Sequence, residues 1–394
     1  MRVAVFGSFF PHFEYSATFT TGLTYLLSRV DDVDSITVYG PEDSTLPRWL
    51  DGRLVKLRPC WVYDDPLSLG KCASQLIKDS VDIDLFLCNI YLTSFGRNHV
   101  VNAVGLMIPT VVAMRTGRPV GTYAHNFLET QDVERLGYSP GFATRFATRL
   151  LELALIRSTT VVFPLASQAA AVNRAFRSNA GSQFIPYVDA VHTVEDVNPP
   201  GQSPVREASS PTEILLFGSW GPQKDLAGAA RMLNTLIQSG HNLRILVAGS
   251  MNRNFKSAMG VAETSLQSLP KGRVTIQWDV PYDQVAPLFR RADVLFMPYV
   301  TTGGHSGVMS TAAFHSLPII AYDLPQLREC AEQLGAWAEF IRPGDISALE
   351  RALERVHEIS KLDRTPSVLG YEQRLANAVS SVKGLLNVIS SRRR

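Results

Sequence analysis

The feature that most constrains this chain is an alternation of short apolar runs with longer runs whose apolar residues recur at helical spacing. Residues 3–6 are apolar throughout, which is typical of a strand buried on both faces of a sheet. After them, Phe19, Leu23 and Leu26 mark one face of a helix. The same order returns along nearly the whole sequence. It predicts an α/β fold in which parallel sheets are covered by helices.

The alternation occurs in two series, separated by a stretch of different composition. Residues 197–211 carry four prolines among serines and charged residues, which is typical of a linker. A length of 394 residues also exceeds the size at which one hydrophobic core usually stops growing. We therefore predict two Rossmann-like, doubly wound domains that face each other across a cleft. The predicted segments are an N-terminal domain at 1–190, a linker at 191–211, a C-terminal domain at 212–365, and a C-terminal helix with a basic tail at 366–394, for which packing back on the first domain is one arrangement.

Individual elements follow from the same pattern. The first series predicts strands at residues 3–6, 36–39, 84–88, 120–123 and 160–163, a further run in this series at 110–113, and a short edge at 184–186. The second series predicts strands at 214–218, 244–248, 274–277, 294–297 and 319–322, and helices at 282–291, 307–315, 346–359 and roughly 371–389.

Charge and cysteine content narrow the functional classes. The formal net charge of +2 argues against a strong electrostatic commitment to nucleic acid, and residues 392–394 form a solvated arginine tail. The N-terminus lacks a signal-peptide pattern, and no run approaches the roughly 18 apolar residues of a membrane span. We expect a cytoplasmic protein, with the inner face of the membrane as a second location. The cysteines lack close or metal-type spacing and are expected to be reduced thiols: Cys60, Cys72, Cys88 and Cys330.

Three glycine-containing loops join a strand to a helix, where backbone N–H groups can hold an anion. The first begins at Gly7, and a plain tight turn explains it equally well. In the second, Gly218 and Ser219 precede Lys224 at the start of a helix, where an ammonium group would add to the attraction for phosphate. The third, residues 302–309, combines three glycines with small hydroxyls and can form a nest for phosphate.

His125 is the polar side chain of the first half that we weight most. It follows the strand predicted at 120–123, so it should lie where the carboxyl ends of the strands open onto the cleft. An imidazole can donate a hydrogen bond to a sugar hydroxyl or a phosphate oxygen. A histidine satisfied inside the core is the alternative interpretation.

The order of these motifs resembles that of glycosyltransferases of family 4, a retaining group with the GT-B architecture. The resemblance covers roughly residues 212–360 and rests on five motifs together. They are Gly218 with Lys224, the strand end Ala248-Gly249, the segment 292–298 with its aspartate-valine and proline, the turn and helix at 306–321 with Leu317-Pro318, and Pro343-Gly344-Asp345 with Leu349. In the first half, residues 117–126 and 82–85 are similar to the family more weakly.

The resemblance implies transfer of a sugar from a nucleoside-diphosphate sugar to an acceptor hydroxyl, with anomeric retention. The main task of the active site would be to stabilise the departing diphosphate electrostatically. His125 and Lys224 are the catalytic candidates, and the base would be read near residues 278–280. The candidate donor and nucleotide contacts are Gly7, Gly218, Ser219, Lys224, Gly249, Asp279, Val280, Gly304, His305, Ser306, Gly307, Val308 and Thr311.

The chain departs from the family pattern at several positions. Gly303 and Thr311 stand where the family usually has two glutamates, and Ser219 stands where an arginine usually follows the strand-ending glycine. The paired glycine of the first loop is replaced near Glu14-Tyr15. The sequence Asp82-Ile83-Asp84 precedes a strand and is interpreted as a turn, so we expect no metal and no cofactor.

Two other functions remain open at this point. A non-catalytic nucleotide-sugar-binding or scaffold subunit would suit the missing glutamates. A nucleotide-sugar epimerase of the same fold would need carboxylates in the cleft, at the positions that hold Gly303 and Thr311.

A helix near residue 150 allows two interpretations of its own. Arginines at 145, 149 and 157 recur beside Phe142, Phe146, Leu150 and Leu153. The helix could pack its apolar face on the first domain, which we favour, or it could lie on a membrane surface.

Overall fold

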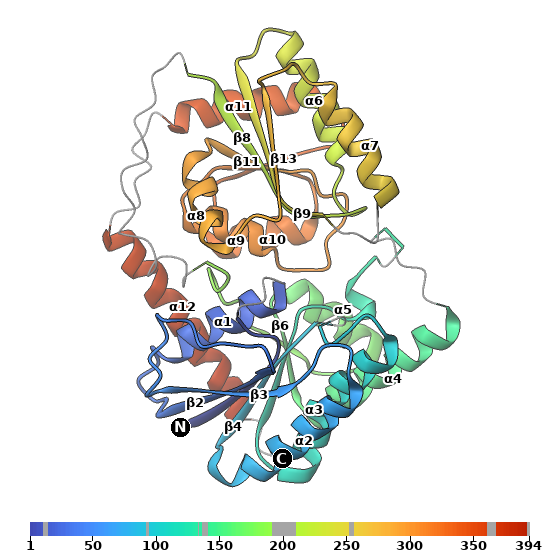
Figure 1. Ribbon diagram of the computed structural model, residues 1–394, viewed down its shortest axis with the longest axis vertical. Helices are drawn as coiled ribbons and strands as arrows, with labels where there is room; N and C mark the ends of the chain where they lie inside the picture. Colours follow the sequence, from blue (N-terminus) through green and yellow to red (C-terminus); the bar gives the residue numbers. More distant parts are fainter. Residues whose placement is uncertain are drawn as a thin grey trace.

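Two parallel β-sheets, each flanked by helices, form two lobes (Figure 1). The structure is a computed structural model that describes residues 1–10, 15–91, 94–132, 134–135, 141–190, 210–251, 256–360 and 368–391. The N-terminal sheet has seven strands in the order β3-β2-β1-β4-β5-β6-β7, and the C-terminal sheet has six in the order β10-β9-β8-β11-β12-β13. This architecture confirms the predicted α/β fold of two doubly wound parallel sheets.

The strands run parallel to their neighbours in both sheets. In the N-terminal sheet they are β1 (Arg2–Phe6), β2 (Ser35–Pro41), β3 (Val55–Trp61), β4 (Leu85–Ile90), β5 (Val120–Ala124), β6 (Thr160–Phe163) and β7 (Gly181–Ser182). In the C-terminal sheet they are β8 (Thr212–Trp220), β9 (Leu243–Met251), β10 (Val274–Trp278), β11 (Val294–Met297), β12 (Ile319–Tyr322) and β13 (Ala338–Ile341). Every residue of β4, β5, β11 and β12 is buried, because helices cover both faces of the sheets.

The covering helices follow the strands in chain order. Those of the first lobe are α1 (Tyr15–Leu27), α2 (Pro66–Asp79), α3 (His99–Thr116), α4 (Phe142–Ser158) and α5 (Ala166–Phe176), with 3-10 turns η1 (Ser80–Asp82) and η2 (Leu128–Thr130). Those of the second lobe are α6 (Leu226–Gln238), α7 (Lys256–Gln267), α8 (Tyr282–Arg291), α9 (Gly307–Phe314), α10 (Pro325–Leu334) and α11 (Ile346–Ser360). A last helix, α12 (Val368–Ser391), ends the described chain.

Several elements differ from the sequence-based expectations. Residues 110–113 lie inside α3, and residues 184–186 lie outside the strands, with β7 preceding them. The edge strands β3 and β13 had no counterpart among the predicted strands. The linker expected at 191–211 lies outside the described residues apart from its last two positions, and the basic tail at 392–394 lies outside them as well.

The expectation of four reduced thiols is wrong for two of them. Cys60 in β3 and Cys72 in α2 form a disulfide, with their Cα atoms 5.2 Å apart. The two residues are neighbours because α2 packs beside β3, which their sequence spacing did not reveal. Cys88 and Cys330 are free and buried.

The helix α12 returns to the N-terminal lobe and lies against α1 (Figure 1). Ala378, Val382 and Leu385 are fully buried there. Gly121 of β5 has no side chain at the point where Ile389 packs, and a Cβ at this position would overlap Ile389. Outside this core, Lys383 pairs with Asp32 at 2.9 Å.

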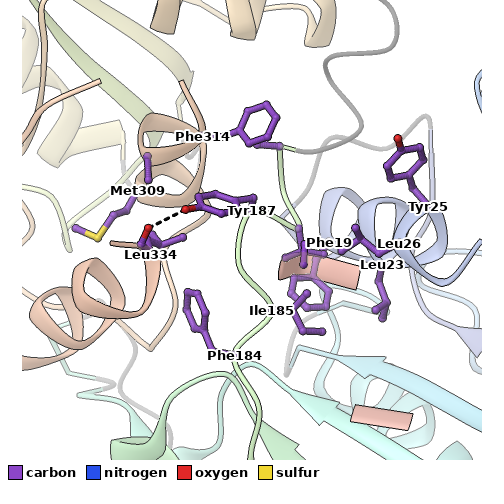
Figure 2. Close-up of a cluster of buried hydrophobic side chains, with 14 of the residues drawn as sticks. Phe19, Leu23, Tyr25, Leu26, Phe184, Ile185, Tyr187, Met309, Phe314 and Leu334 are labelled. Carbon is purple, nitrogen blue, oxygen red and sulfur yellow. Dashed lines mark hydrogen bonds between the residues drawn. The ribbon is translucent and has the colours of Figure 1, made fainter. Parts of the chain in front are cut away.

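The two lobes share one continuous hydrophobic core. Figure 2 shows Tyr187, from the segment after β7, reaching between Phe314 and Leu334 of the C-terminal lobe. Its hydroxyl donates to the Leu334 carbonyl oxygen at 2.8 Å, and its ring lies 5.9 Å from that of Phe314. Apolar burial between the lobes therefore contributes to holding them in this arrangement.

One helix among the described residues, α3, is by length and composition apolar enough to cross a membrane, with a mean hydropathy of 1.2. Half of it is buried in the lobe, where it packs between α2 and α4. This length and apolar composition are also common in the core helices of globular lobes.

Candidate active site

Two neighbouring strands of the C-terminal sheet carry glycines at the edge that faces the other lobe. Gly218 of β8 pairs with Gly249 of β9, and both have positive φ, 137° and 122°. A Cβ on Gly249 would overlap the backbone of Gly218, so only glycine allows this approach. Both glycines are buried, and side chains from nearby segments lie over Gly218. Ser219, the next residue, is exposed.

Lys224 reaches back over Gly218. A Cβ on Gly218 would overlap the Lys224 ammonium and would lie 3.5 Å from both Tyr299 Oη and Val308 Cγ2. The ammonium lies 4.6 Å from the centre of the Tyr299 ring and 5.4 Å from that of Trp220. These distances bring together the ends of β8 and β11 and the first turn of α9.

Among the described residues, no acidic side chain balances the charge of Lys224. Lys224 makes no ion pair within the described part of the chain. The residue as a whole is half-buried. Desolvation of its ammonium lowers the pKa of Lys224 to about 7. A bound anion would reverse this penalty, because an adjacent negative charge favours the protonated form.

The glycine-rich turn leads into α9 beside this lysine. Ser306 is the N-cap of α9, and its hydroxyl accepts a hydrogen bond from Met309 N at 3.3 Å. Gly304 has a φ of 150°, and Gly307 and Val308 at the helix start are partly exposed. Thr311 is buried, and its hydroxyl donates to Gly307 O at 2.9 Å, so it belongs to the helix itself.

The side chain of His305 does not face the lysine. Its Nε2 lies 3.0 Å from Asp189 Oδ2, at the end of the N-terminal lobe, and its ring packs on Phe184. Both members of the pair are buried. Burial lowers the pKa of His305 to about 4 and raises the pKa of Asp189 to about 7. This residue therefore connects the lobes.

His125 lies directly after β5, at the carboxyl edge of the N-terminal sheet. Its Nε2 is 2.6 Å from Asn89 Oδ1, and the edge of its ring meets Phe19 with the centroids 4.5 Å apart. Asn89 in turn donates to Thr20 Oγ1 at 2.9 Å, which orients its oxygen toward the histidine. Burial holds the pKa of His125 well below its usual range, so the imidazole is neutral at physiological pH.

Comparisons with known proteins place this geometry in a wider context. Residues 211–358 match the sequence model of the family described as glycosyl transferases group 1. A comparison with curated proteins found no match. Among solved structures, HepE from Anabaena in complex with UDP-glucose is 12% identical, with a TM-score of 0.66 and coverage of 99% of this chain and 100% of HepE.

Two further solved structures resemble the whole chain. Sucrose-phosphate synthase from Thermosynechococcus elongatus is 14% identical, with a TM-score of 0.61 and coverage of 100% and 97% of the two chains. Trehalose 6-phosphate synthase from Burkholderia multivorans is 11% identical, with a TM-score of 0.62 and coverage of 99% and 98%. The fold is GT-B. At these identities the likeness of the structures shows the fold alone.

The contact between the two lobes brings together residues that the sequence does not link. Gln168 of α5 donates from one amide nitrogen to His125 O and to Gly303 O, both at 2.8 Å. Gln131, which follows η2, lies against the same turn: a Cβ on Gly303 would be 2.7 Å from its Nε2. This nitrogen is buried and has no hydrogen-bond partner among the described residues. No periodicity or motif marks either glutamine, so the sequence analysis missed both.

The remaining predicted residues lie just after β1 and β10, at the carboxyl ends of these strands. Gly7 directly follows β1 and lies close to α1 and β4, since a Cβ would be 3.0 Å from Thr20 Oγ1 and 3.2 Å from Asn89 O. Asp279 has a φ of 53° and donates from its backbone N to Gly249 O at 2.7 Å, and Val280 follows it.

The predicted turn at Asp82-Ile83-Asp84 lies away from these residues, at the opposite end of β4 from Asn89. Arg2 pairs with Asp82 at 3.3 Å and with Asp84 at 3.2 Å, which accounts for both carboxylates. Within the described residues, no group of three or more His, Cys, Asp or Glu side chains is arranged to hold a metal ion.

Proposed function

We propose that this protein transfers a sugar from a nucleoside-diphosphate sugar to an acceptor hydroxyl. The observation that supports this best is the position of the Lys224 ammonium, which lies over Gly218 and close to Val308 at the start of α9 and has no acidic partner among the described residues. Backbone N–H groups of Gly307 and Val308 would add to its attraction for a diphosphate. The family match of residues 211–358 and the UDP-glucose bound by HepE support a nucleotide-sugar donor.

We assign the side chains that would contact the transferred sugar to the region between the two lobes. His125, neutral and fixed by Asn89, would orient a sugar hydroxyl. Gln131 occupies the space that a side chain at Gly303 would fill. A neutral amide would thus take the place where the resemblance to family 4 implies a carboxylate.

Three finer features belong to this proposal. The resemblance implies membership of family 4 and retention of anomeric configuration, which proton NMR of the first-formed product would test through the anomeric coupling. Transfer without a metal ion is expected to continue after chelation with EDTA. A cytoplasmic location, or one at the inner face of the membrane, completes the proposal and is tested by fractionation.

The nucleotide site is tested by calorimetry with UDP, GDP, ADP and TDP and their glucose conjugates. One of these is expected to bind, and Lys224→Ala should weaken it at least about tenfold, since a hydrogen bond to a charged group contributes about 1.5–3 kcal/mol. Lys271→Ala, at an exposed lysine of the same lobe, serves as the control. Absence of heat with every nucleotide would contradict the proposal.

A non-catalytic nucleotide-sugar-binding subunit is the second candidate. The observation that favours it is the lack of a carboxylate at Gly303 and Thr311, the latter with its hydroxyl bound to its own helix. Such a protein would bind the nucleotide sugar through Lys224 and would turn over neither water nor any acceptor in a panel.

A further inference from the structure

The helix α4 exposes a continuous apolar stripe. Phe142, Phe146 and Leu150 recur at four-residue spacing and are 85%, 56% and 52% exposed. The rings of Phe142 and Phe146 stack with their centroids 6.3 Å apart. The opposite side of the helix holds Leu155 and Glu152, which are buried. The packing interpretation favoured from the sequence is therefore wrong for these three apolar residues.

A groove of about 290 Å³ continues this stripe toward α5. Its apolar walls come from Leu150, Leu153 and Phe176, and Arg149 and Arg157 stand beside them. The guanidinium of Arg149 lies 5.4 Å from the centre of the Phe176 ring. Stripe and groove together form one surface, which we call the α4 face.

The α4 face carries positive charge. Arginines are the charged side chains of α4 that reach solvent, because the one acid of this helix, Glu152, is buried and its pKa is raised to about 8 by desolvation. The exposed Arg174 and Arg177 lie on and just after α5. Acidic groups from neighbouring segments pair with three arginines: Glu134 with Arg145, Glu129 with Arg149, and Asp132 with Arg135.

We propose that the α4 face docks on an anionic lipid bilayer. Phenyl rings interleaved with arginines suit the boundary between acyl chains and anionic headgroups. There the rings can contact the acyl chains while the guanidinium groups contact the headgroups. The same charges disfavour a second copy of the chain, because an isologous contact would bring arginine against arginine. The inference does not rest on the proposed transferase activity, since it uses the surface of the N-terminal lobe alone.

Vesicle flotation with the full chain tests this docking. The wild type is expected to float with vesicles that contain phosphatidylglycerol and phosphatidylcholine and to remain behind with phosphatidylcholine alone. Binding should weaken as salt rises, because the attraction to a charged surface is screened. Equal binding to both kinds of vesicle, or to neither, would overturn the proposal.

Variants locate the contact. Arg145→Gln with Arg149→Gln should lower the partition coefficient about fivefold per arginine, and Phe142→Ser with Phe146→Ser should abolish flotation. The matched controls are Arg53→Gln and Leu67→Ser, which alter exposed side chains elsewhere on the same lobe and should float like the wild type. Circular dichroism and the unfolding midpoint verify that each variant folds. Wild-type flotation of the folded α4 variants would overturn the assignment, as would a concentration-dependent dimer that they abolish.

Discussion

At the residue scale, the candidate site depends on side chains that are held away from their preferred charge state or partner. Lys224 has a lowered pKa, His125 is kept neutral, and the buried amide nitrogen of Gln131 has no partner among the described residues. Groups perturbed in this way cluster at functional sites, because a ligand can supply what the folded chain withholds. Lys224 and Gln131 can each be tested by substitution.

The first concerns Lys224 and pH. Because burial lowers its pKa to about 7, the free protein loses the ammonium charge as the pH rises from 6 to 8. Affinity for a nucleotide sugar should fall about tenfold over this range, since only the protonated form attracts the diphosphate. Calorimetry at several pH values measures this, with a nucleotide sugar as ligand because its diphosphate diester does not titrate there. Lys224→Arg, which stays protonated, should bind with little dependence on pH; an equal dependence in both proteins would exclude the lysine.

The second concerns Gln131 and Gly303. Gly303→Ala should weaken nucleotide-sugar binding because the new Cβ meets the Gln131 amide at 2.7 Å, and in a Gln131→Ala background this penalty should disappear. A coupling of about 0.5–3 kcal/mol is typical of residues in contact. Gly70→Ala in α2, where a Cβ meets nothing within 4 Å, is the control. Additive effects of the two changes on the measured affinity would show that the side chains do not share this space.

At the element scale, strongly patterned segments were predictable and mixed ones were not. The helix α8 has the predicted bounds, and α9 differs by one residue at its end. The edge strands β3 and β13 carry exposed or half-buried residues at most positions, so they lack the apolar run that marks a buried strand. Residues 110–113 are rich in β-branched side chains, yet packing places them in α3.

In the candidate site too, features with a local sequence pattern were predictable and the others were not. The placement of Gly218, Lys224 and the turn before α9 could be predicted because they lie in or after neighbouring strands of one sheet. The contacts between the lobes could not be predicted, since Gln168 and Gly303 are 135 residues apart and His305 and Asp189 are 116 apart. Local patterns carry no information about such contacts.

The packing of α12 on the first lobe gives a prediction about elements. Gly121→Ala should lower the free energy of unfolding by about 1–3 kcal/mol, because its Cβ would overlap Ile389. Ile389→Ala should recover part of this loss in the double variant by making room. Chemical denaturation measures each value, and a full loss that persists in the double variant would contradict this packing.

At the scale of the whole molecule, a polar contact between α10 and the start of α5 joins the two lobes in addition to their shared hydrophobic core. Glu329 accepts hydrogen bonds from Ala166 N at 2.6 Å and from Ser167 N at 3.3 Å, so a carboxylate of the second lobe caps a helix of the first. Helix N-termini favour negative charge. With Gln168 and the Asp189–His305 pair, this contact stabilises the arrangement in which the candidate site is assembled.

Removing the cap should open the molecule. Glu329→Ala is expected to increase the radius of gyration of the unliganded protein in solution scattering and to raise KM for the donor more than it lowers kcat. Glu332→Ala, at an exposed glutamate of the same helix, should leave both unchanged. An unaltered radius in Glu329→Ala would mean that the cap does not govern the opening.

The return of α12 to the first lobe means that the polypeptide passes between the lobes twice, once after residue 190 and again between 360 and 368. A body joined to another at one point can swivel about every axis, whereas two joints leave mainly the rotation about the line that connects them. Opening of the two lobes should thus be a hinge rotation about one axis, and not a free reorientation of one lobe relative to the other. Cutting the chain between α11 and α12 would leave a single joint and permit orientations that the intact protein does not reach.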